Sequence, residues 1–277
     1  MERIRGHLQK MKARAEAPVA YSLHLGEHEL PLNSFLGQTV SIEWLGEISC
    51  IACGQQVRKS FNQGYCYSCF RTLARCDLCV VKPELCHYAQ GTCREPSWGL
   101  ANCMQPHYVY LANSSGLKVG ITRASQIPVR WLDQGAVQAL PVFRVHSRYE
   151  AGLLEVALKQ YVADRTEWRR MLRGEPEFHD LPAHRDALLV RCGKVLSSSS
   201  DSSESTVTAP VDGAIVQTFR YPIIAYPSRV VALHLEKTTK IEGTLLGIKG
   251  QYLMFDTGVL NVRKFTGYAV SVSIGAG

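Results

Sequence analysis

Cysteine is the residue type whose spacing in this chain most clearly indicates chemistry. Nine of the ten cysteines lie within residues 50–103, and Cys192 stands apart. A spacer of two residues lets both thiolates of a pair bind one ion, and two such pairs complete the tetrahedral sulfur shell that zinc prefers. We therefore predict a structural zinc site at the first two pairs, which are Cys50 and Cys53, then Cys66 and Cys69.

A second group of candidate ligands follows directly and is larger than one zinc ion can take. Because the protein would fill every position of both shells, we expect both zinc ions to be structural. Buried apolar thiols, or a catalytic zinc with an open position at the second group, are the alternatives. The predicted ligands of the second site are Cys76, Cys79, Cys86 and Cys93, with His87 or Cys103 as alternates.

Disulfides are the other common use of clustered cysteines. Residues 1–17 are basic and lack the apolar run of a secretory signal. No stretch approaches the roughly 18 to 20 uncharged apolar residues of a membrane span. We therefore expect a cytoplasmic protein without membrane-spanning segments, a setting that favours metal binding over disulfides.

Hydrophobic patterning divides the rest of the chain into parts that would position these residues. The start of the chain is helix-prone, and alternating apolar residues follow it. A serine-rich run interrupts the hydrophobic pattern later in the chain. After this run, short strand-like segments are separated by glycines. We predict an α+β protein. Its parts would be an N-terminal helix and β-hairpin unit (1–49), a zinc-ribbon module with two sites (50–106), a central α/β domain (107–195), a serine-rich linker (196–217) and a small all-β barrel (218–277).

The central part begins with a predicted hairpin. Residues 108–112 and 117–122 are strand-like, and the Asn-Ser-Ser-Gly sequence between them is typical of a turn. Helical patterns follow around 127–134 and 150–163, with a strand at 139–145 between them.

This hairpin resembles the start of GIY-YIG endonucleases. Tyr-Val-Tyr at 108–110 occupies the position of the first family tripeptide, and Lys-Val-Gly at 118–120 matches a divergent variant of the second. Arg130 follows on the next helix. The stretch 151–159, which contains Glu155, is similar to the metal-binding helix of the nuclease subunit of bacterial excision repair.

The resemblance implies roles for five residues. Glu155 would hold Mg²⁺ or Mn²⁺, and Tyr110 would position or deprotonate the attacking water. Arg130 would stabilise the charge that builds on the phosphate, and Lys118 would contact phosphate. Gly120 would be structural, since it permits a close approach.

Composition is compatible with a polyanionic partner. The net charge is +7, and residues 107–195 hold most of the excess, with 13 basic and 9 acidic side chains. The whole chain also resembles an uncharacterised bacterial domain family, a resemblance that implies no activity. We predict a zinc-containing protein that binds DNA or RNA and acts as a divalent-ion-dependent endonuclease. The alternative is a non-catalytic adaptor that binds nucleic acid or protein and uses the hairpin only as a scaffold.

Overall fold

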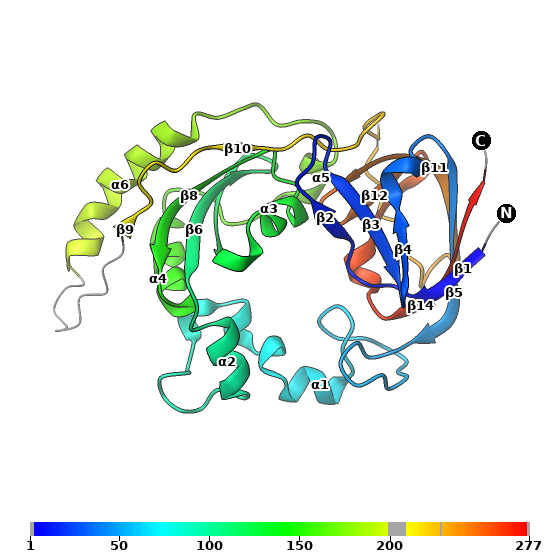
Figure 1. Ribbon diagram of the computed structural model, residues 1–277, viewed down its shortest axis with the longest axis horizontal. Coiled ribbons are helices and arrows are strands. Elements are labelled where there is room, and N and C mark those ends of the chain that lie inside the picture. The colour runs from blue at the N-terminus through cyan, green and yellow to red at the C-terminus, as the bar shows by residue number, and fades with distance from the viewer. Residues whose placement is uncertain (1–2, 199–208, 228, 276–277) are drawn as a thin grey trace.

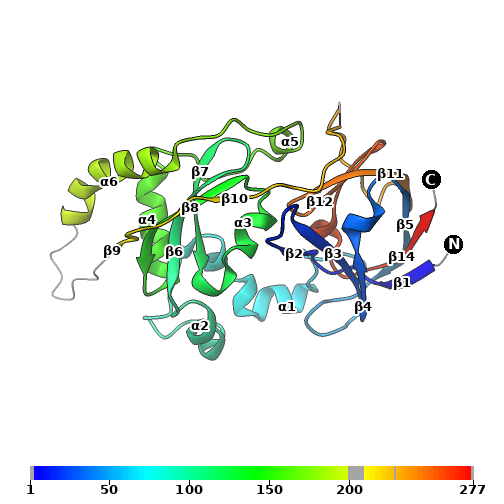
Figure 2. The same cartoon turned by 45° about the horizontal axis from the view of Figure 1, so that its top comes forward.

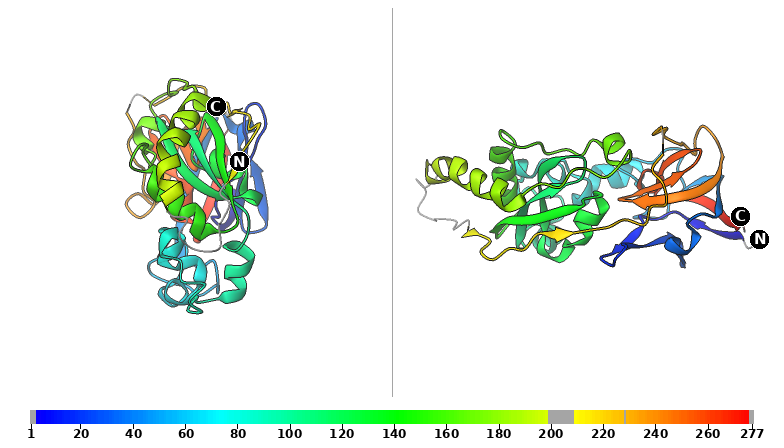
Figure 3. Two further views of the ribbon diagram at one scale, coloured as in Figure 1. Left: turned by 90° about the vertical axis from the view of Figure 1, so that its left-hand side faces the viewer. Right: turned by 90° about the horizontal axis from the view of Figure 1, so that it is seen from above.

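The computed structural model describes residues 3–198, 209–227 and 229–275, and the side chains of 192–198 lie outside the described part. The chain forms two lobes that lie side by side (Figures 1 and 3). We call residues 3–49 with 219–275 the terminal lobe, and 107–198 with 209–218 the central lobe. The intervening Cys-rich segment, residues 50–106, lies along one side of both lobes (Figure 2). The prediction of a mixed α and β protein is confirmed.

The terminal lobe contains a six-stranded antiparallel sheet that joins the two ends of the chain. The strand order is β1-β14-β5-β11-β12-β13, so a strand from the N-terminal part lies between two strands from the C-terminal part. The strand bounds are β1 Arg3–His7, β5 Thr39–Ile48, β11 Lys240–Lys249, β12 Tyr252–Phe255, β13 Gly258–Asn261 and β14 Tyr268–Gly275.

Two expectations for these residues were wrong. Residues 1–17 do not form a helix: within the described part, 3–7 and 12–14 are strands, because β14 and β3 offer partners that local helix propensity does not anticipate. No sheet of the described residues closes into a barrel within 218–277, because β14 and β11 both pair with β5 instead. The strand signals there mark half of a shared sheet.

A smaller sheet, with the order β2-β3-β4, completes the terminal lobe. It connects to the larger sheet through a bridge between Leu8 and Leu25, both fully buried. The bounds are β2 Lys12–Arg14, β3 Ala20–Leu25 and β4 His28–Pro31.

The central lobe is built on a second antiparallel sheet, β10-β8-β6-β7, with β9 also pairing with β8. Because β6 and β7 pair directly, the predicted hairpin is confirmed. The bounds are β6 His107–Asn113, β7 Leu117–Arg123, α3 Val129–Asp133, β8 Gln138–Val145, α4 Arg148–Leu158, α5 Trp168–Met171, α6 Leu181–Ser198, β9 Ala209–Pro210 and β10 Gln217–Thr218.

The two faces of β6 contact different partners, because successive side chains of a strand point to opposite faces of the sheet. Val109 and Leu111 belong to a core with the apolar residues of α4 and α6, including Leu154. Tyr110 and Ala112 belong to a core that includes α3 and continues into the terminal lobe. The two lobes therefore share the core on one face of β6, and the core on its other face belongs to the central lobe alone.

The second half of the predicted serine-rich linker (196–217) contains strands in the structure. Residues 199–208 lie outside the described part, but 209–210 and 217–218 are the strands β9 and β10, which both pair with β8. In the part of the chain that the structure describes, no helix is both long and apolar enough to span a membrane.

Lys249, at the end of β11, is a charged group buried where the lobes meet. Its side chain is fully buried, and its ammonium lies 5.5 Å from the ring centres of both Tyr221 and Tyr226. Within the described residues the Nζ atom has no hydrogen-bond partner. Burial lowers the pKa of Lys249 to about 8, although the charge of Glu175 partly opposes this.

We expect Lys249→Met to stabilise the protein at neutral pH. Below pH 8 the lysine is charged in both states, so folding bears the full cost of burying the charge, about 3 kcal/mol for a shift of this size. The gain should shrink between pH 8 and about 10.4, because only the unfolded state then holds the proton. Urea unfolding at pH 7 and pH 10 measures it. Lys240→Met, on an exposed part of the same strand, is the control, and a Lys249→Met protein less stable than wild type at both pH values would contradict the prediction.

Candidate functional site

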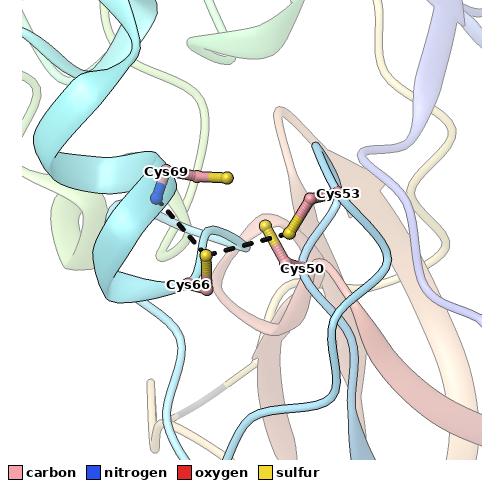
Figure 4. Close-up of side chains that lie close together, drawn as sticks. All are labelled: Cys50, Cys53, Cys66 and Cys69. Atoms are coloured by element: carbon pink, nitrogen blue, oxygen red, sulfur yellow. Dashed lines mark hydrogen bonds between the residues drawn. The ribbon is translucent and has the colours of Figure 1, made fainter.

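Two of the first four cysteines come from a turn and two from the start of a helix, and the pairs meet beside the terminal lobe (Figure 4). Cys50 and Cys53 lie in a tight turn after β5, where Gly54 adopts a φ of 74° and donates its N–H to the carbonyl of Cys50. Cys66 is the N-cap of α1 (Tyr67–Thr72), and its sulfur accepts the N–H of Cys69 at 3.3 Å. The sulfur atoms of all four residues lie within 4.8 Å of one another.

The spacing of these sulfurs fits a tetrahedral zinc centre. Thiolates held at the usual zinc–sulfur distance of about 2.3 Å lie about 3.8 Å apart in a tetrahedron. The Cys53 and Cys66 sulfurs are 3.9 Å apart. The predicted cluster can therefore hold zinc.

Backbone hydrogen bonds prepare one of these thiols for metal binding. Burial disfavours the thiolate of Cys50, but the N–H groups of Cys66, Ala52 and Cys53 outweigh it and lower the pKa of Cys50 to about 6. The pKa of Cys69 is instead raised, because its thiol is hydrogen-bonded to the sulfur of Cys66 and lies near the other thiols. A bound cation would remove the unfavourable interaction between neighbouring thiolates, since it stabilises all four of them at once.

The second group of predicted ligands is divided by the fold. Asp77, Cys79 and His87 present ligand atoms within 4.8 Å of one another and could hold zinc. Cys76 is not among them. It lies buried in a short 3-10 helix, Ala74–Cys76, where the side chain of Asn62 is hydrogen-bonded to its sulfur.

Asp77, His87, Cys79 and the three remaining cysteines of this group lie around one small cavity. It is bounded by three short 3-10 helices and by α2 (Pro96–Asn102). The cysteines that line it are Cys79, Cys86, Cys93 and Cys103.

The residues that resemble a nuclease site come together in the central lobe. Tyr110 on β6 lies opposite Gly120 on β7, and Lys118 extends from the same strand as Gly120. Arg130 is on α3 and Glu155 on α4. The charges of Arg130 and Glu155 both act on Lys118 and on Tyr110, so four elements bring these side chains to one place.

Burial shifts the pKa values of this group. It lowers the pKa of Lys118 to about 8, helped by the neighbouring Arg130 and opposed by Glu155. It also raises the pKa of Glu155, against the effect of Lys159, whose ammonium is 3.7 Å from the Glu155 carboxylate. Glu155, Lys118 and Arg130 therefore lie near enough for their charges to act on one another.

Sequence reasoning missed two charged members of the group. Lys159 also lies 3.1 Å from Asp164, which is brought to β7 because the N–H of Val119 donates to the carbonyl of Ala163 at 2.7 Å. The spacing of four residues between Glu155 and Lys159 on one helix was a usable signal. Asp164 had no local signal, since its place depends on the chain that follows α4.

Tyr110 is fully buried, and its hydroxyl donates to Oε1 of Gln134 at 2.8 Å. Burial raises the pKa of Tyr110, although the hydrogen-bonded Arg130 favours its ionised form. The ring leans on Gly120, where a Cβ atom would come within 2.7 Å of the Tyr110 hydroxyl oxygen. The predicted structural role of Gly120 thus has a physical basis, which is room for the tyrosine.

We expect Gly120→Ala to destabilise the protein by about 2 kcal/mol, because the added methyl group would displace Tyr110 and break its bond to Gln134. Denaturant unfolding measures this. Gly174→Ala is the control, since a Cβ atom there meets nothing within 4 Å. Equal stability of the two variants would show that the tyrosine can move at no cost.

Comparison with known proteins identifies one family. A family model described as "Protein of unknown function (DUF2797)" matches residues 37–270. No curated protein and no solved structure matches the chain.

Proposed function

The chain belongs to the DUF2797 family of proteins of unknown function, and we propose its activity from its own residues: divalent-ion-dependent cleavage of nucleic acid phosphodiesters in the central lobe, with zinc as a structural element. The observation that carries the proposal is the convergence of Lys118, Arg130 and Glu155 from three elements, with their charges acting on one another.

The donor set suits a hard divalent cation. Glu155 is half-buried and Asp164 lies close enough for its charge to raise the pKa of Glu155, after the larger effect of burial. Two neighbouring carboxylates offer the oxygen ligands that Mg²⁺ and Mn²⁺ prefer. A bound ion of this kind would polarise a phosphoryl oxygen and lower the pKa of a bound water molecule.

The cations of the group suit a phosphate. Lys118 and Arg130 would bind its non-bridging oxygens and offset the charge that grows on them during attack. Tyr110 is better placed as a positioning residue than as a base, because its hydroxyl is buried, bonded to Gln134 and raised in pKa. It would hold Arg130 in place.

The burial of Tyr110 also favours the second candidate function, a non-catalytic adaptor. In that case Lys118 and Arg130 would bind phosphate groups, and the hairpin would serve only as a scaffold.

A cleavage assay tests the proposal. It uses labelled branched, single-stranded and duplex DNA and RNA, each with Mg²⁺, with Mn²⁺ and without added ion. Cleavage that requires the ion is the expected result. Salt-sensitive binding without cleavage would favour the adaptor. The absence of both binding and cleavage would exclude the nuclease and an adaptor for nucleic acid, and would leave an adaptor for a protein partner.

A further inference from the structure

We propose that Cys79, Cys86, Cys93 and Cys103 form a second four-sulfur zinc centre, and that Asp77 and His87 support it without binding the metal. The proposal concerns the Cys-rich segment and does not depend on the proposed cleavage.

The cavity between these cysteines has the size of a single-ion site. All four side chains line it, and its volume is about 10 Å³, room for one ion or one water molecule. Asp77, His87 and Arg94 line it as well. Four cysteine sulfurs around a space of this size match the tetrahedral sulfur shell of a structural zinc site.

The four thiols surround the same small cavity from separate elements. Cys79 lies in one short 3-10 helix, Cys86 follows another, and Cys103 is the C-cap of α2. Cys103 is buried and the other three are partly buried. Thiolates gathered around one space repel one another unless a cation binds among them.

Asp77 and His87 already have partners. The Asp77 carboxylate lies 2.6 Å from Nε of Arg94, which neutralises its charge, and accepts the N–H of Cys79. Nδ1 of His87 is 2.7 Å from the hydroxyl of Thr92, and its Nε2 lies 3.5 Å from Asp77. These contacts orient the loop of Cys79, as groups around a metal centre commonly do.

The proposed centre lies against the helix that carries Glu155. Arg148, the first residue of α4, donates from Nη2 to the carbonyl of Val80 at 2.6 Å, and the charges of Cys103, Glu155 and Cys79 act on its guanidinium. A Cβ atom on Gly152 would come within 2.5 Å of Cβ of Pro83, so helix and loop are in close contact. The zinc centre therefore fixes the surface on which α4 rests.

The zinc content of the purified full-length protein tests the ligand set. We expect two zinc ions per chain in the wild type and about one in Cys103→Ser. Cys76→Ser is the matched control, a buried cysteine of the same segment outside the cavity, and it should retain two ions, as should His87→Ala. Two ions in Cys103→Ser, or the loss of one in His87→Ala, would overturn the proposal.

A measurement on the wild type alone covers the case in which Cys103→Ser fails to fold. Zinc X-ray absorption should give an average shell of four sulfurs at about 2.3 Å and no nitrogen or oxygen. If Asp77 and His87 were ligands of the second ion, the shell would include nitrogen and oxygen, and the proposed set would be wrong. Neither readout involves cleavage, so failure here is distinct from failure of the proposed nuclease.

Discussion

Serine in place of Cys66 is expected to remove one zinc ion per chain and to unfold the segment around α1. Structural zinc contributes about 10 to 16 kcal/mol to small domains at neutral pH, which exceeds the whole stability of many proteins. Cys66 is buried, and its sulfur also caps α1. Serine can still cap this helix, so the effect comes from the lost zinc ligand, and we expect this substitution to have the largest effect on stability.

The effect should extend beyond the loop itself. Ser49, next to Cys50, donates its N–H to the carbonyl of Gly267 in the terminal lobe. We therefore expect a lower melting temperature as well as the loss of one ion, measured by circular dichroism and elemental analysis. Ser68→Ala, an exposed position between Cys66 and Cys69, is the control. Full zinc content in Cys66→Ser would refute the assignment.

Glutamine in place of Glu155 is expected to reduce divalent-ion-dependent cleavage by about 1,000-fold, which corresponds to about 4 kcal/mol in the barrier. The amide preserves the shape of the side chain but lacks the charge that would hold the ion. Binding of nucleic acid should change little, because Lys118 and Arg130 remain. Single-turnover cleavage and a binding titration, made on the same substrate, separate the two effects.

Glu150→Gln is the matched control for this variant. Glu150 lies on the same helix but accepts hydrogen bonds from the hydroxyl of Ser147 and the N–H of His146, away from the charged group. The Glu150→Gln variant should cleave nucleic acid at the wild-type rate. Unchanged cleavage in Glu155→Gln would place the metal, or the activity itself, elsewhere.

Local patterns were sufficient where the interacting residues are close in sequence. The spacing of Cys50, Cys53, Cys66 and Cys69 specified a cluster because each pair is set by one short turn. The hairpin of β6 and β7 followed from alternation and turn residues, which determine the pairing of adjacent strands. In both cases the contacts need no information from distant parts of the chain.

Local patterns failed where the partner is distant. The first strand, β1, has a basic and helix-prone sequence, and only β14 at the other end of the chain makes it a strand. Cys76 belongs to a convincing pair by spacing, yet its loop turns it away from the cavity that Cys103 reaches from the end of α2. Asp164 reaches the charged group only because residue 163 lies beside β7.

The shared sheet of the terminal lobe also sets an order for folding during synthesis. β5 is made before the central lobe, but its partners β11 and β14 are made after it. The strands β6, β7 and β8 pair with neighbours in sequence, so loop closure delays them little. The central lobe can therefore fold first, while β1 and β5 keep unpaired edges until β11 and β14 have been made, and unpaired edges of this kind are prone to pair with other chains.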